Sequence, residues 1–94
     1  MVNTMKKNNQ PIYGIDQFKN KCWYLNGQFH REDGPAVESA GGTKAWYFHG
    51  QYHRLDGPAV EYSDGTKEWY YHGEYINCSS QEEFERLINL KVLW

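Results

Sequence analysis

Two copies of one polar pattern, His-Arg-x-Asp, are the residues of this chain whose types and spacing best suit chemistry. They are His30-Arg31-x-Asp33 and His53-Arg54-x-Asp56. Arginine can hold a phosphate or a carboxylate through two parallel hydrogen bonds, so the His-Arg pairs could form a row of anion-binding sites. Each Asp is also followed by Gly-Pro, and Asp is a frequent turn-former because its side chain bonds nearby backbone groups. The pattern therefore predicts either an anion site or a brace for the turn. We favour the brace because the pattern recurs in step with the turns.

A metal site and a catalytic site have weak support. The four histidines are His30, His49, His53 and His72. Equivalent turn histidines two strands apart would be about 10 Å from each other, too far for ligands that bind one metal at about 2.0–2.3 Å. No Gly-rich phosphate loop precedes a helix. Helix capping explains Ser79 and Ser80, and Cys22 and Cys78 have no evident base partner. We expect no catalytic residue, no metal and no cofactor, and we do not expect an enzyme.

A fixed 23-residue interval separates Trp23, Trp46 and Trp69, and it sets the elements that position these patterns. Each unit runs from its Trp to a glycine in a tight turn, which is Gly27, Gly50 or Gly73. Asn-Gly in the first unit predicts a type I′ hairpin turn, in which both central residues need positive φ. His-Gly takes that place in the other two units, and His tolerates this region better than most residues. A period this short predicts stacked copies of one supersecondary unit.

The 94 residues predict a single, mainly β domain. We expect an antiparallel β-meander built from 23-residue hairpin repeats, forming a single sheet that a C-terminal α-helix caps. The expected segments are a flexible start (1–10), a leading strand or cap (11–20), repeats (21–43, 44–66, 67–78), and a capping helix with a tail (79–94). Ser80 with Glu83 fits a capping box, and Phe84, Leu87 and Ile88 form one apolar stripe. This stripe should lie over the Trp face of the last repeat.

Alternation along the strands assigns two faces to the sheet. The tryptophans form the core face, and Tyr24, Tyr47 and Tyr70 point the other way at steps of about 10 Å. Tyr62, Tyr13 and Tyr75 should widen this tyrosine surface. Tyrosine is enriched in protein interfaces, and aromatic residues make up 17% of the chain. The face is either a partner-binding surface or the exposed side that a single-layer sheet cannot avoid. We expect Trp23, Trp46, Trp69, Asp33, Asp56 and the three turn glycines to be structural.

Charge and composition exclude several classes of protein. The net charge is −2, from 10 Lys and Arg against 12 Asp and Glu, so no basic field favours nucleic acid. No stretch is apolar and long enough to span a bilayer. The two cysteines occupy unrelated positions of the repeat, which favours reduced thiols in a cytosolic protein. We therefore expect a cytoplasmic protein without a membrane span.

The repeated motif resembles a known family. Trp-x-x-x-Gly-x-x-His-Arg-x-Asp-Gly-Pro-Ala-Val-Glu is similar to the variant form of the MORN-type repeat, which occurs in YwqK-type bacterial antitoxins and in phage and large-virus proteins. The resemblance covers Lys21 to Tyr75, and Arg31 and Arg54 stand where the common MORN repeat carries glycine. It implies a binding module or scaffold, encoded by a bacterium or a phage. The C-terminal helix lies outside the family pattern.

The expected function is therefore protein–protein binding, as an inhibitor or neutraliser of the antitoxin-like or phage counter-defence kind. If the protein is phage-encoded, it would act in the host cytoplasm. Two alternatives stay open. One is a homo-oligomeric scaffold, because an open meander leaves unpaired strand edges. The other is a binder or sponge for a small phosphorylated ligand that uses the His-Arg-Asp rows.

Overall fold

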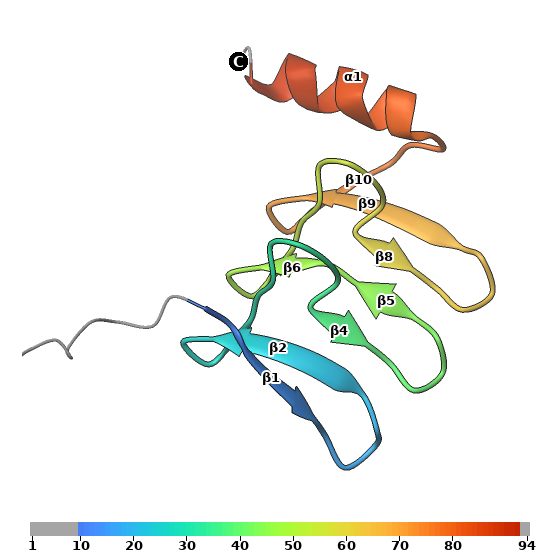
Figure 1. The fold of residues 1–94 in the computed structure, drawn as a ribbon. Helices are drawn as coiled ribbons and strands as arrows, with labels where there is room; N and C mark the ends of the chain where they lie inside the picture. Colours follow the sequence, from blue (N-terminus) through green and yellow to red (C-terminus); the bar gives the residue numbers. More distant parts are fainter. Residues whose placement is uncertain (1–9, 93–94) are drawn as a thin grey trace, which may run out of the picture.

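The computed structural model describes residues 10–92 and shows short strands stacked along one direction, with a helix across the far end (Figure 1). The mainly β fold, its antiparallel meander and the C-terminal helix are confirmed. The strands are β1 (Ile12–Ile15), β2 (Lys21–Leu25), β3 (Gln28–Phe29), β4 (Val37–Glu38), β5 (Lys44–Ala45), β6 (Tyr47–Phe48), β7 (Gln51–Tyr52), β8 (Val60–Glu61), β9 (Lys67–Tyr71) and β10 (Glu74–Ile76), and the helix is α1 (Gln81–Val92).

Every strand pair is antiparallel, and the main sheet has the order β1-β2-β4-β5-β8-β9-β10, with β3 also paired to β2. β6 and β7 form a separate two-stranded ladder, so the single sheet that the sequence predicts is interrupted in the middle repeat. The interruption lies at Trp46, between β5 and β6. In the outer repeats the long strands β2 and β9 continue past the equivalent tryptophan, because β1 and β10 pair with them there.

Trp23 and Trp46 each bond through their backbone to both ends of a loop that leaves the sheet. The Trp23 N–H donates to Ala36 O at 2.8 Å, and its carbonyl accepts from the His30 N–H at 3.0 Å. Residues 30–36 therefore leave and rejoin the sheet at one point. Residues 53–59 do the same at Trp46, with distances of 2.7 and 3.0 Å. The two His-Arg-x-Asp patterns lie in these loops, which we call loop A (30–36) and loop B (53–59).

The predicted tight turns are present in all three repeats. Asn26 and Gly27 have φ of 54° and 80°, and the His-Gly turns have 50° and 82°, then 47° and 86°. Two positive φ angles in succession are what a type I′ turn requires. The second and third turns also bond to the preceding repeat, since the Gly50 N–H donates to Phe29 O at 2.9 Å and the Gly73 N–H to Tyr52 O at 2.8 Å.

The best-buried core lies where α1 meets the last repeat. Trp69, Ile76 and Phe84 are buried together there, and Phe84 is fully buried. The Ser80 hydroxyl accepts from the Glu83 N–H at 3.1 Å, which is half of the predicted capping box. The Glu83 carboxylate accepts from the N–H of Ser79 instead of Ser80, at 3.0 Å. The predicted packing of the helix on the Trp face of the last repeat is thus present.

Trp23 and Trp46 are less buried than Trp69, because polar loops rather than a helix cover them. The predicted flexible start falls largely on residues 1–9, and the end of the apolar tail on residues 93–94, both outside the described residues. Between residues 10 and 92, no helix has the length and apolar character needed to cross a membrane.

Candidate functional site

The histidines of the two polar patterns join neighbouring repeats. His30 is buried, and its Nδ1 accepts a hydrogen bond from the backbone N–H of His49 at 2.8 Å. His53 Nδ1 accepts in the same way from the His72 N–H, also at 2.8 Å. The rings of each pair are in contact, with centroids 4.4 and 4.0 Å apart. Because Nδ1 accepts in both residues, the proton of the neutral ring is placed on Nε2. The histidines therefore brace the turn of the next repeat.

The arginines brace their own loops and cover the tryptophans. Arg31 donates from Nε to the Asp33 carboxylate at 3.0 Å and from Nη1 to the Pro35 carbonyl at 3.1 Å. Its guanidinium lies 3.8 Å from the Trp23 ring centroid. Arg54 repeats this arrangement in loop B with Asp56, Pro58 and Trp46 at the same three distances. A guanidinium on an indole face adds a cation–π attraction to the hydrogen bonds.

The glycine after each aspartate makes room for this guanidinium. A Cβ on Gly34 would lie 2.9 Å from Arg31 Cζ, and one on Gly57 would lie 2.6 Å from Arg54 Cζ. Real Cβ atoms essentially never approach a neighbour this closely. The Asp-Gly-Pro sequence of each loop is thus fitted around the arginine in front of it.

An open hollow of about 680 Å³ lies between loop A and loop B, with Trp46 and Phe48 among its lining residues. It contains the two arginines, which could in principle attract an anion, but it is also lined by Glu32, Asp33 and Asp56. The two aspartate side chains are 85% and 87% exposed. Carboxylates outnumber the arginines in this hollow, and Arg54 also forms a 2.9 Å ion pair with Glu61. The charge balance therefore gives little attraction for a phosphate.

On the opposite face, aromatic rings stack continuously from β2 to β10. We call this set the aromatic ladder; its members are Tyr24, Phe29, Tyr47, Tyr52, Tyr70 and Tyr75. Successive ring centroids are 5.1, 5.0, 4.7, 4.7 and 5.5 Å apart. The structure thus brings together Tyr24, Tyr47 and Tyr70, which the sequence analysis placed on one face. Tyr75 of β10 joins them as predicted, and Phe29 of β3 and Tyr52 of β7 are additional members. The prediction for Tyr13 was wrong: it pairs directly with Trp23 and lies on that face, with ring centroids 4.8 Å apart.

Phe29 and Tyr52 were not predicted from the sequence to belong to this surface. They fill the spaces between the predicted tyrosines, so the rings are in contact instead of standing about 10 Å apart. The signal that could have found them is their position just after each tight turn. In an antiparallel hairpin, directly paired residues share a face, and Tyr24 pairs with Phe29 as Tyr47 pairs with Tyr52.

The ladder is exposed at both ends and extended at one side by Tyr62. Tyr24 is 36% exposed, Tyr75 is 53% exposed, and Tyr62 is 39% exposed. The hydroxyls of Tyr62 and Tyr70 donate to the Glu68 carboxylate at 3.0 and 3.4 Å. The hydrogen bond to Glu68, with a contribution from burial, raises the pKa of Tyr62 to about 12.

The pKa values of two inner tyrosines of the ladder, Tyr47 and Tyr70, are also raised. Burial, together with the neighbouring Tyr52 hydroxyl, raises the pKa of Tyr47 well above its ordinary value. Burial also raises the pKa of Tyr70, followed by the charge of Glu68. Near neutral pH the ladder therefore offers apolar ring bodies with uncharged hydroxyl groups, a combination suited to protein interfaces.

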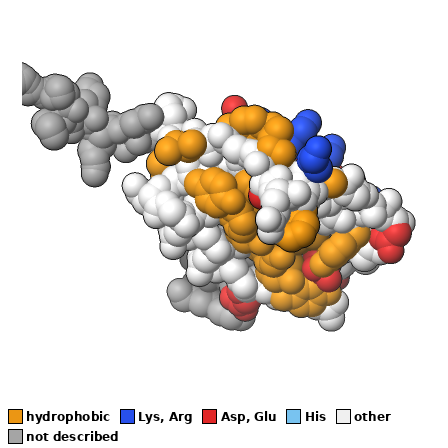
Figure 2. Space-filling model, turned by 90° about the horizontal axis from the view of Figure 1, so that it is seen from below, with side chains coloured by type: hydrophobic (Ala, Val, Ile, Leu, Met, Phe, Trp, Pro, Cys, Tyr) orange, Lys and Arg blue, Asp and Glu red, His pale blue; other side chains and the backbone are white. Residues whose placement is uncertain are grey.

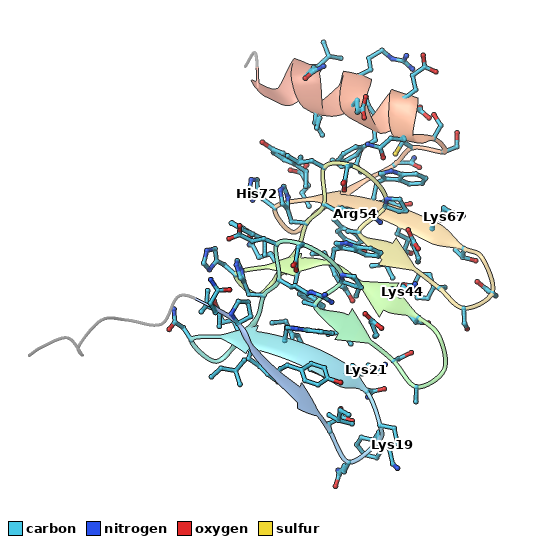
Figure 3. All side chains as sticks on the ribbon, viewed as in Figure 1. Lys19, Lys21, Lys44, Arg54, Lys67 and His72 are labelled. Carbon is cyan, nitrogen blue, oxygen red and sulfur yellow. The ribbon has the colours of Figure 1, made fainter. Side chains whose placement is uncertain are left out.

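Among the side chains that the structure describes, the lysines and arginines form no continuous positively charged surface. Lys21, Lys44 and Lys67 follow one side of the stack, together with Lys19 (Figure 3). In the strand register, however, Glu38 stands between the first two of these lysines and Glu61 between the last two. Opposite charges therefore alternate along this side of the sheet, which gives no continuous basic path for a nucleic-acid backbone.

Metal-ligating and nucleophilic groups are dispersed. Across residues 10–92, no three His, Cys, Asp or Glu side chains are placed to hold a metal ion. Cys22 is buried and Cys78 is partly buried, and they are not joined. Burial raises the pKa of the Cys78 thiol, and the nearby Glu83 charge adds to this, so the thiol is a poor nucleophile near neutral pH.

No family model, no curated protein and no solved structure matches this chain. The similarity to MORN-type repeats therefore stays an expectation drawn from the motif.

Proposed function

We propose that this protein acts by binding another protein through the aromatic ladder, and that binding neutralises the partner. The inhibitory role, an antitoxin-like or phage counter-defence setting and a cytoplasmic location follow from the motif resemblance. The ladder is the observation that supports the binding role. It is a contiguous aromatic surface on a face that neither loop covers.

The two faces of the sheet differ in a way that supports this proposal. On the tryptophan face, loops A and B and α1 engage the three indoles through arginine stacking and through a 2.8 Å hydrogen bond from Trp69 Nε1 to Gln81. The ladder rings mostly contact one another. Partly exposed aromatic rings of this kind are the usual anchors of protein interfaces, and a few of them carry most of the binding energy.

The phosphorylated-ligand alternative has less support. The Arg31 and Arg54 side chains each donate to an aspartate and to a proline carbonyl, and the hollow between them carries an excess of carboxylates. A phosphate would have to compete with these carboxylates for the same guanidinium groups.

Comparative capture tests the proposal. We would prepare the wild type, a ladder variant (Tyr24→Ser, Tyr62→Ser and Tyr75→Ser) and a control variant (Leu55→Ser and Leu90→Ser). The control residues are also exposed, at 53% and 49%, but lie in loop B and α1. Each tagged protein is used to capture partners from the native cells, followed by mass spectrometry.

We expect one protein to be captured by the wild type and the control variant and lost by the ladder variant. Adding the purified wild type should then lower the activity of that captured protein. Equal capture by all three proteins would contradict a role for the ladder. Capture without any loss of partner activity would contradict neutralisation and leave binding alone.

A further inference from the structure

The end of the stack opposite α1 is apolar and exposed. Figure 2 looks onto this end and shows hydrophobic side chains gathered across it. Ile12, Tyr13, Ile15 and Phe18 are 69%, 48%, 58% and 68% exposed. The other end of the stack has α1 packed on its last strands. Only the β1 end therefore presents both a strand edge and an apolar surface without a covering element among the described residues.

The outer edge of β1 has backbone groups that face away from β2. Trp23 directs its N–H to Ala36 and its carbonyl to His30, so both groups point away from its β1 partner, Tyr13. The Tyr13–Trp23 pair is thus a non-hydrogen-bonded pair of the β1–β2 ladder. By the alternation of antiparallel pairing, the N–H and carbonyl of Tyr13 and of Ile15 point outward. Gly14 lies between them and points its backbone groups toward Cys22 on β2.

We propose that β1 pairs antiparallel with β1 of a second copy of this chain, with Gly14 opposite Gly14 of that copy at the two-fold axis. In this register each Tyr13 faces an Ile15, and the two residues exchange both of their outward hydrogen bonds. Centring the pairing on Tyr13 instead would place Ile15 opposite Pro11, which has no N–H to donate. The Gly14-centred register therefore uses every outward group of the short strand.

Side chains fit the same register. Tyr13 and Ile15 lie on the Trp23 face of β1. The dimer would therefore place the Ile15 side chain of one copy beside the Tyr13 ring of the other. Gly14 would form a non-hydrogen-bonded pair, in which the Cα atoms approach to about 4.5 Å. Its lack of a side chain suits this approach. β1 also carries no charge, and charge is a common device that prevents edge pairing.

The chain's own first residues are the competing occupant. Nine residues precede Gln10, where the described chain begins beside β1, and they include Lys6, Lys7, Asn8 and Asn9. This stretch is mostly polar and offers few apolar side chains to the exposed isoleucines and Phe18. A second copy offers the same apolar set in return. The net charge of −2 also gives little repulsion between copies.

Sedimentation velocity of the full chain over a concentration series tests this pairing. The wild type should reach twice the monomer mass of 11.1 kDa as its concentration rises. Ile15→Pro removes one outward N–H and leaves the bonds to β2, because proline is tolerated at the open side of an edge strand. It should stay monomeric with an unchanged thermal midpoint. A wild type that is monomeric at every concentration, as it would be if residues 1–9 covered the edge, overturns the proposal.

Disulfide trapping tests the register directly. Open space surrounds the position of a Cβ on Gly14, and the expected Cα separation lies within the range that disulfides span, about 4.4–6.8 Å. Cys22 is the direct partner of Gly14 on β2 and could compete for a thiol placed there. In a background with both native cysteines replaced (Cys22→Ala and Cys78→Ser), Gly14→Cys should form a covalent dimer under mild oxidation, and Gly41→Cys, in a distant turn, should not. A wild-type dimer in which Gly14→Cys fails to cross-link overturns this register. Since Ile15→Pro leaves the aromatic ladder intact, loss of dimerisation and loss of partner capture are separate outcomes.

Discussion

At the scale of single residues, the loops are organised around their arginines. Arg54 contacts Trp46 with its planar face and bonds Asp56, Pro58 and Glu61 with its edge. Gly57, which follows Asp56, leaves room for this side chain, because the Arg54 guanidinium lies where a Cβ would be. The His-Arg-x-Asp-Gly-Pro sequence therefore reads as one structural unit, in which each residue type has a contact that requires it.

His53 predicts a pH dependence of stability. Burial lowers its pKa below the ordinary value of 6.5, and the nearby His72 adds to this effect. The unfolded chain therefore binds a proton at this residue more readily than the folded chain does. The free energy of unfolding should fall as the pH drops from 6.5 toward the lower pKa of the folded state, and this contribution should be constant above that range. Protonation would also place a hydrogen on Nδ1, which accepts from the His72 N–H.

His53→Asn measures this contribution. The Asn side-chain oxygen can accept a hydrogen bond at a position similar to that of Nδ1, and it does not titrate. Urea denaturation would measure the free energy of unfolding of both proteins above and below pH 6.5. As the pH falls through this range, the variant should lose less of this free energy than the wild type. Equal losses in the two proteins would contradict this role of His53.

The sequence was informative about residues wherever local chemistry decides the structure. The positive φ of Asn26 and Gly27 could be predicted because that pair favours a type I′ turn. The contact of His30 with the backbone of His49 could not be predicted, since it joins two repeats across 19 residues. The group that donates to His30 is a backbone N–H, which every residue except proline has, so the residue types do not indicate the contact.

At the scale of elements, α1 takes the place that a third loop would occupy. Loops A and B each place an arginine on the tryptophan of their repeat. Trp69 instead donates from Nε1 to the Gln81 side chain at 2.8 Å and packs against Phe84. Gln81 also donates to Leu55 O in loop B at 2.7 Å. The helix therefore ends the repeat stack and fastens the preceding loop.

Phe84 should carry much of the stability of this end. It is fully buried, and replacing such a ring with alanine typically lowers the free energy of unfolding by about 3–5 kcal/mol. That is a large share of the roughly 5–15 kcal/mol of a whole domain. Denaturant unfolding of Phe84→Ala should show this loss. Leu90→Ala, on the exposed side of α1, should change the value by no more than about 0.5 kcal/mol. Equal losses for the two variants would contradict the packing described for α1.

The helix could be predicted from the sequence because its cap and its apolar stripe are local. The break between β5 and β6 could not, because Lys44, Trp46 and Tyr47 are identical to their equivalents in β2 and β9. The difference comes from the neighbours. In the outer repeats a partner strand lies directly opposite the tryptophan: Tyr13 of β1 pairs with Trp23, and Ile76 of β10 pairs with Trp69.

At the scale of the whole molecule, the protein is thin. Its principal extents are 49 × 36 × 16 Å, close to a single layer of sheet with loops and a helix on one face. Such a shape leaves a large face uncovered, and the aromatic ladder occupies that face. Tyr24, Tyr47 and Tyr70 could be predicted from the 23-residue interval. Their contacts with Phe29 and Tyr52 depend on the register of each hairpin, which the interval alone does not specify.

Site-specific photo-crosslinking in the native cells tests the role of the ladder most directly. A photoreactive phenylalanine analogue would replace Tyr24 or Tyr75 at the two ends of the ladder, or Leu55 in loop B as the control. Each replacement keeps an apolar side chain at an exposed position. If the ladder is the interface, both ladder positions cross-link to the same protein and Leu55 does not. A partner that cross-links from Leu55 and from neither Tyr24 nor Tyr75 would contradict a role for the ladder in binding.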